Sequence, residues 1–64
     1  MITYMINGNK VSEDTAFYRF SCFQVRVRGL PKGVSVIRSL WESCHTNVET
    51  RIRELPDNLE LVIE

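Results

Sequence analysis

Apolar residues recur at spacings of three and four through the second half of the chain. The series consists of Ile37, Leu40, Trp41, Cys44, Val48, Ile52 and Leu55. This spacing places side chains on one face of a helix, so it predicts an amphipathic helix that Ser35 caps and Pro56 ends. The segment 46–49 matches a Thr-x-x-Glu capping box, so the alternative is a helix that breaks near His45 and restarts.

Two short segments, one near each end of the chain, have the two-residue alternation of β-strands. Ile2–Ile6 is rich in β-branched and aromatic residues, and the Asn7-Gly8 pair that follows it is typical of a tight turn. Leu59–Ile63 places three apolar residues on one face and Glu60 on the other. We therefore predict an opening strand and a closing strand.

Residues 12–28 allow two interpretations. In the first, Ser12 caps a short helix whose inner face holds Ala16, Phe17 and Phe20. In the second, Ala16–Arg28 is one bent strand, with a bulge that brings its apolar residues onto one face. Aromatic and β-branched residues dominate this stretch, which favours the strand, and we expect Phe23–Arg28 to be a strand in either case.

The predicted elements occur in the order strand, strand, helix, strand. If the helix returns the chain, the last strand runs antiparallel to the first, and the apolar segment Ile2–Ile6 fits the central position. The prediction is an α+β fold over residues 1–64 as a single domain: a three-stranded antiparallel ββαβ sheet of order 2-1-3 with one main amphipathic helix on one face. The edge strand Leu59–Ile63 is then open to pairing with a second copy.

The composition excludes several classes of protein. At 64 residues, 44% of them hydrophobic, the chain is long enough for one small core but not for a deep substrate cleft. Its longest apolar run is far below the roughly 18 to 20 residues of a membrane span. Met1 is not followed by the pattern of a signal peptide, so we expect a cytoplasmic protein. Two cysteines are too few for a disulfide-rich secreted domain.

The residue types that carry chemistry do not form a recognisable motif. The single histidine, His45, is expected on the helix surface, and its neighbour Cys44 on the apolar face. With Cys22 they lack the spacing of a zinc site. The acidic residues that lie near one another in the chain are expected to be solvated surface residues and not a pair for acid-base catalysis. We therefore predict no catalytic residue, no metal site and no cofactor, and a protein that is not an enzyme.

The distribution of charge is more informative than its sum of zero. Residues 1–38 hold six basic and two acidic side chains, whereas 39–64 hold two basic and six acidic ones. This asymmetry is typical of a surface that binds nucleic acid or an acidic partner. The residues of such a nucleic-acid surface would be Arg26, Arg28, Lys32 and Arg38, with Tyr18 for stacking. In the alternative interpretation, Glu60 and Glu64 neutralise the basic strand within the fold.

These observations favour a non-catalytic protein-interaction module: an adaptor, an inhibitor or a regulatory accessory protein, a class common in bacteria and phages. Its partner would be another protein of unknown identity, and a domain of this size is expected to gain stability as a homodimer. The alternative function is nucleic-acid binding through the basic residues named above.

Overall fold

The sheet is built around the first strand of the chain. The computed structural model describes residues 1–31 and 35–64. In it, β1 (Ile2–Ile6) pairs antiparallel with β2 (Asn9–Val11) on one side and with β3 (Leu59–Ile63) on the other. The predicted order 2-1-3 and the α+β class are confirmed. The second strand is not the predicted one, however: it follows directly from a two-residue turn in which Asn7 and Gly8 both have positive φ.

Residues 13–28 form a helix, α1 (Glu13–Arg28), so the prediction of a bent strand over Ala16–Arg28 is wrong, as is that of a strand over Phe23–Arg28 in either interpretation. The alternative of a helix capped by Ser12 is confirmed, and this helix extends through Phe23–Arg28. Ser12 caps the helix by accepting a hydrogen bond from the backbone N–H of Thr15. Gly29 ends it in the left-handed conformation, with φ 68°. The two caps and the burial of one helix face outweigh the strand preference of the aromatic and β-branched residues, because strand preference depends strongly on context.

The predicted amphipathic helix is broken into α2 (Ser35–Thr46) and α3 (Val48–Glu54). The break foreseen near His45 is confirmed, but the cap is Asn47, whose side chain accepts from the N–H of Thr50 at 3.1 Å. Ser35 is the first helical residue and not the predicted cap. The described residues thus form three helices where one main helix was predicted.

The break changes which apolar residues of the predicted stripe are buried. The core contains Tyr4, Ala16, Phe20, Ile37, Trp41, Cys44, Leu59 and Leu61. Trp41 lies at its centre, with the rings of Tyr4, Phe17, Phe20 and His45 packed around it. In α3, by contrast, Val48 and Ile52 are 59% and 78% exposed. Beyond the break, Leu55 still packs against the core, but Val48 and Ile52 do not.

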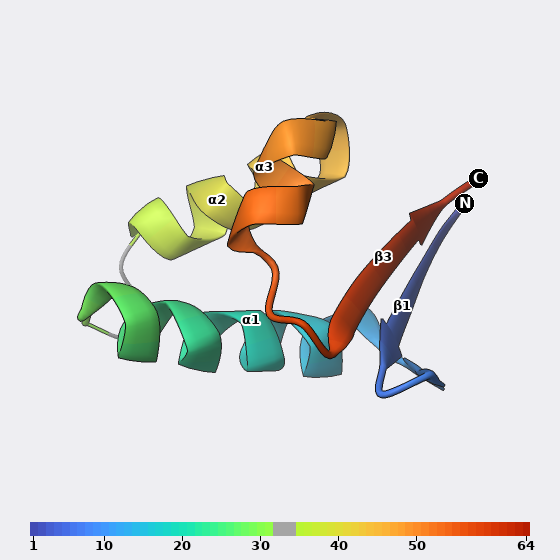
Figure 1. Ribbon diagram of the computed structural model, residues 1–64, viewed down its shortest axis with the longest axis horizontal. Helices are drawn as coiled ribbons and strands as arrows, with labels where there is room; N and C mark the ends of the chain where they lie inside the picture. Colours follow the sequence, from blue (N-terminus) through green and yellow to red (C-terminus); the bar gives the residue numbers. More distant parts are fainter. Residues whose placement is uncertain (32–34) are drawn as a thin grey trace.

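The strands extend away from the helices, and the two chain ends meet at their tip (Figure 1). The amino group of Met1 donates to the backbone oxygen of Glu64 at 2.8 Å, and the N–H of Glu64 donates back to the oxygen of Met1 at 2.9 Å. Helix α1 runs beneath α2 and α3 in this view. Across residues 1–31 and 35–64, none of the helices has both the length and the apolar content of a membrane span.

Candidate binding groove at the free edge of the sheet

Strand β3 occupies an outer position in the sheet, and only one of its sides is paired. Antiparallel neighbours alternate between pairs that exchange backbone hydrogen bonds and pairs that do not. The bonds from Asn7 N–H to Asn58 oxygen and from Glu64 N–H to Met1 oxygen fix that alternation at both ends of β3.

It follows that the even-numbered residues of β3 bond to β1, whereas the odd-numbered ones direct their backbone groups to the open side. The N–H of Leu59 donates a hydrogen bond to the backbone oxygen of Pro56 at 3.1 Å. The N–H groups of Leu61 and Ile63 have no backbone acceptor within the described part of the chain. These groups form a free edge that is able to bond another strand.

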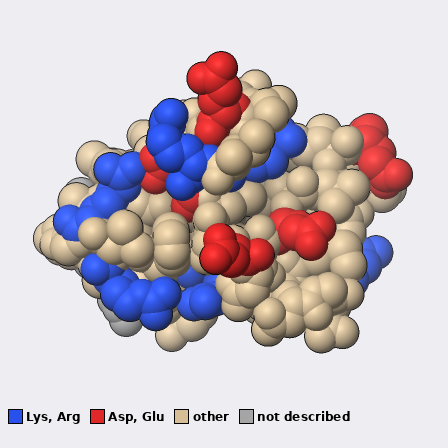
Figure 2. Space-filling view, viewed as in Figure 1, with Lys and Arg blue, Asp and Glu red and all other residues tan. Residues whose placement is uncertain are grey.

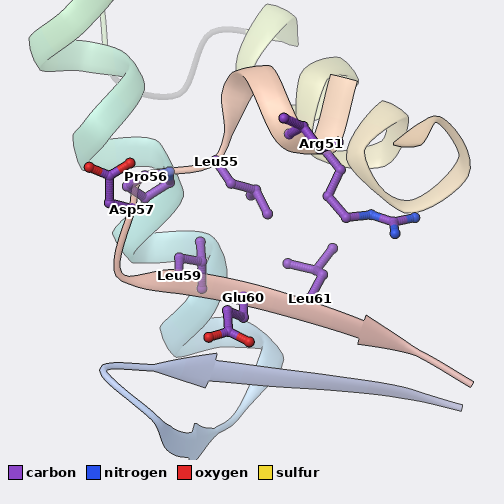
Figure 3. Close-up of a pocket in the computed structure, with 8 residues that line it drawn as sticks. Arg51, Leu55, Pro56, Asp57, Leu59, Glu60 and Leu61 are labelled. Atoms are coloured by element: carbon purple, nitrogen blue, oxygen red, sulfur yellow. The ribbon is translucent and has the colours of Figure 1, made fainter. Parts of the chain in front are cut away.

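A groove of about 300 Å³ runs beside this edge, between α3 and β3 (Figure 3). The residues that line it are Arg51, Ile52, Leu55, Pro56, Asp57, Leu59, Glu60 and Leu61. Figure 3 shows Leu55, Leu59 and Leu61 pointing into the space between the helix and the strand. Glu60 points the other way, because successive side chains of a strand alternate between its two faces.

The break at Asn47 accounts for the open side of the groove. After it, α3 carries Ile52 to the surface at 78% exposure, although the side chain is fully apolar. Pro56 ends α3 and is buried, and the turn after it returns the chain to the sheet. The groove is therefore lined by apolar residues from a helix and from a strand that are adjacent in the chain.

Helix α3 is held in place by a buried polar network centred on Glu54. The side-chain N–H₂ of Gln24, in α1, donates to the backbone oxygen of Glu54 at 3.0 Å. Arg28 and Arg53 bind the carboxylate of Glu54, one on each oxygen. Burial raises the pKa of Glu54, but the hydrogen bonds and charge of these partners outweigh it, and the pKa lies below the ordinary glutamate value.

A second contact joins α3 to α2. The guanidinium of Arg51 donates from Nε to the backbone oxygen of Cys44 at 2.8 Å, near the end of α2. Orphan carbonyl groups at a helix C-terminus are good acceptors for such a cation. Arg51 therefore fixes one wall of the groove, and part of its hydrogen-bonding capacity is already in use.

The predicted basic patch is dispersed in the structure. Arg26 and Arg28 stand in a helix, where residues two apart point to different sides, and not on one face of a strand. Arg28 pairs with Glu54, and Arg38 lies over the ring of Phe17 at 4.3 Å. Tyr18 is 66% exposed and available for stacking. Lys32 lies outside the described residues.

Neutralisation of the basic residues by Glu60 and Glu64 is also wrong for Arg28, because Glu54 is its partner. Arg26 is exposed and lines a second hollow, of about 370 Å³, on the other side of the Pro56 turn. The other residues that line it are Arg19, Phe23, Pro56, Asp57 and Asn58. Of the predicted nucleic-acid residues, this hollow contains only Arg26, which lies here with Arg19 and Phe23, two residues of α1 that were not predicted.

His45 is not the surface residue that its position suggested. Its Nδ1 lies 2.6 Å from the backbone oxygen of Trp41, and its Nε2 lies 2.9 Å from the hydroxyl of Tyr4. A carbonyl oxygen only accepts, so in the neutral ring Nδ1 carries the proton and Nε2 accepts from Tyr4. Both nitrogens are engaged within the core, and the ring has a structural role.

Cys44 is buried as predicted, and burial raises the pKa of its thiol to about 11, with a smaller contribution from the charge of Glu54. A thiol with such a pKa is a poor nucleophile at neutral pH. Cys22 is half-buried, and both cysteines are free thiols. The exposure of Ile52, a member of the predicted apolar stripe, and the burial of Gln24 were not predicted, since they depend on the break at Asn47 and on Glu54.

Comparisons of this chain with protein-family models, with curated proteins and with solved structures find no match.

Proposed function

We propose that this protein is a non-catalytic protein-binding module whose contact surface is the free edge of β3 together with the groove beside α3. The observation that carries the proposal is the juxtaposition, in one groove, of the open backbone edge at Leu61 with the exposed apolar side chain of Ile52. An added strand would bond to the edge through its backbone and place alternate side chains in the groove.

The biological role that follows is that of an adaptor, an inhibitor or a regulatory accessory protein, acting in the cytoplasm. A protein of this kind binds its target without transforming it, and the groove between α3 and β3 is the surface that supports this role. The homodimer expected from the sequence remains a prediction, and pairing of β3 with a second copy would use the same edge.

Two substitutions in α3 test the site. Val48 and Ile52 are both exposed apolar residues of this helix, but only Ile52 lines the groove. We expect Ile52→Gln to weaken capture of a partner from the cells that make the protein about tenfold or more, and Val48→Gln to leave it unchanged. If the captured proteins are the same for both variants, the groove is not the contact surface.

The backbone edge is tested separately by Ile63→Pro. Proline removes the N–H that points to the open side and leaves the bonds to β1 in place, because residue 63 does not donate to β1. Ile63→Thr is the matched control, since it keeps the N–H. Loss of the partner with proline but not with threonine supports strand addition, and equal retention contradicts it.

The alternative function is nucleic-acid binding, favoured by the stripe of Arg19, Phe23 and Arg26 on α1. If this function holds, a single-stranded oligonucleotide binds with an affinity that falls as salt rises, and Arg26→Ala reduces that dependence. Phe23→Leu would weaken stacking and leave the salt dependence unchanged. No retention of the oligonucleotide at low salt would exclude this function.

A further inference from the structure

The outer face of β3 is acidic. Glu60 and Glu64 are exposed, and Asp57 precedes the strand by two residues. In Figure 2, which has the orientation of Figure 1, acidic side chains follow the line of β3, and basic ones gather over the helical end of this face. Residues 57–64 contain no basic side chain.

From this arrangement we infer that the groove binds an extended peptide segment in which apolar residues alternate with basic ones. The inference rests on the proposed function and specifies the chemistry of the partner. A strand that pairs antiparallel with β3 has its residues directly opposite those of β3 and on the same face. Residues opposite Leu59 and Leu61 enter the groove, where Ile52 and Leu55 form the other wall.

In the added strand, the residues opposite Glu60 and Glu64 lie on the outer face, and basic side chains are the most favourable at these positions. Because the odd-numbered residues of β3 would exchange the hydrogen bonds, Glu60 and Glu64 occupy the positions between them, where opposed side chains approach most closely. Opposite charges at such positions stabilise strand pairing, and like charges destabilise it. The edge therefore selects its partner by charge as well as by hydrogen bonding.

The same rule disfavours a second copy as the occupant. Two β3 strands related by a two-fold axis can exchange hydrogen bonds through their odd-numbered residues in registers centred on residue 60, 61 or 62. The first places Glu60 opposite Glu60, and the last places Glu60 opposite Glu64. The register centred on Leu61 avoids these pairs but opposes Glu60 with Val62 and provides no favourable charge pair.

The probe is a synthetic peptide, Lys-Val-Thr-Val-Lys-Val, whose two lysines align with Glu64 and Glu60 when it runs antiparallel to β3. A second peptide replaces both lysines with glutamate, and a third has the first composition in an order without alternation. Binding is measured by titration, with backbone amide shifts recorded for the full chain. We expect the basic alternating peptide to bind about tenfold tighter than either control and to shift the amides of Leu61 and Ile63 most.

The selection of the peptide by charge is tested by reversing the charges on β3. The double variant Glu60→Lys with Glu64→Lys is expected to reverse the preference, so that it binds the glutamate peptide more tightly than the lysine peptide. The double variant Glu42→Gln with Glu49→Gln, at exposed acidic residues of α2 and α3, is the control and is expected to keep the original preference.

The outcomes separate this inference from the proposed function. Equal binding of the lysine and glutamate peptides, lost with Ile63→Pro, keeps strand addition and overturns the charge selection. Absence of any peptide binding, combined with partner capture that depends on Ile52, also overturns the inference and leaves the binding surface intact. A sedimentation mass of two chains, reduced to one by Ile63→Pro, identifies a second copy as the occupant. Binding that survives Ile63→Pro and Ile52→Gln overturns both.

Discussion

At the scale of single residues, the carboxylate of Glu54 has the largest structural role. It is 5% exposed, and it joins α3 to α1 through Gln24 and Arg28. A buried charge is tolerated only where partners compensate for its lost hydration, and here three side chains do so. Together with the bond from Arg51 to the Cys44 oxygen, this network holds the wall of the groove that α3 provides.

We expect Glu54→Gln to lower the free energy of unfolding by about 1–3 kcal/mol, since hydrogen bonds to a charged group are lost while the volume is kept. The measurement is the urea midpoint at pH 7. Glu42→Gln, at an exposed position of α2, is the control and should change the midpoint little.

The stabilisation that Glu54 provides is also expected to depend on pH. The folded-state pKa of Glu54 lies below the ordinary value of 4.5. The stabilisation is therefore fully present above the pKa of the unfolded chain and is lost as the pH falls through the folded pKa. We expect the difference in unfolding free energy between wild type and Glu54→Gln to be constant from pH 7 to about 5 and to shrink below that. A difference that persists unchanged to pH 3 would contradict the paired carboxylate.

Single residues were predictable from the sequence where their environment is local. The burial of Cys44 follows from its place on an apolar helix stripe and is confirmed. The environment of His45 was not predictable, because its partner Tyr4 is 41 residues away in the chain. The same applies to Glu54, whose partner Gln24 lies 30 residues away.

At the scale of elements, the boundary between α2 and α3 determines the shape of the groove. Asn47 leaves the helical conformation with φ −127° and caps α3, and this break carries Ile52 outward. A continuous helix would have kept the predicted apolar stripe on one face. The sequence signalled a break but assigned the cap to Thr46, one residue too early.

Substitution of the two candidate caps distinguishes these assignments. Asn47→Ala removes the acceptor of the Thr50 N–H and should cost about 0.5–2 kcal/mol of stability. Thr46→Ala removes only a long hydrogen bond, at 3.4 Å, to the oxygen of Ser43. We expect its effect on the urea midpoint to be smaller than that of Asn47→Ala, and the opposite ranking would restore the cap predicted from the sequence.

Amide exchange tests the state of the β3 edge in the free protein. The amides of Glu60 and Val62 are bonded to β1, whereas those of Leu61 and Ile63 point to the open side. We therefore expect slow exchange at Glu60 and Val62 and fast exchange at Leu61 and Ile63, an alternation that NMR resolves residue by residue. Uniform protection along β3 would show that the edge is already covered in solution.

Helix α1 shows how far the local sequence predicts a secondary-structure element. Ser12 was predicted as the cap at its start, whereas Gly29, which ends the helix, was not predicted as a cap. The aromatic and β-branched residues between them favoured a strand, and the buried face of Ala16, Phe20 and Gln24 decided for the helix. That face is buried because α2 and the sheet pack against it, and this packing could not be predicted from a local sequence pattern.

At the scale of the whole molecule, the sheet joins the two ends of the chain. The central place of β1 and its antiparallel pairing with β3 were predictable from the apolar character of β1 and the direction of each strand. The strand on the other side of β1 was not predicted, because β2 is the hairpin partner that follows the Asn7-Gly8 turn. The two oppositely charged halves of the sequence make direct contact through Arg28 and Glu54. The groove between α3 and β3 was not predictable, since it requires the break at Asn47.

Because Met1 and Glu64 are hydrogen-bonded to each other, closing the backbone into a ring should stabilise the fold. A linker of two or three glycine and serine residues would remove chain entropy from the unfolded state, with a gain of up to about 4 kcal/mol on the entropic model of chain cross-links. The urea midpoint of the circular chain is compared with that of a linear chain carrying the same linker at one end. A lower midpoint for the circle would show that the ends are apart in solution.

Trp41 gives this molecule a built-in optical reporter. It is the single tryptophan of the chain, it is 1% exposed, and its indole N–H has no hydrogen-bond partner within the described part of the chain. Its fluorescence is therefore expected to have the short emission wavelength of a dry environment and to resist quenching by iodide. Trp41 does not line the groove. A ligand that docks on a preformed edge will leave this emission unchanged, whereas one that remodels the core will shift it to the red.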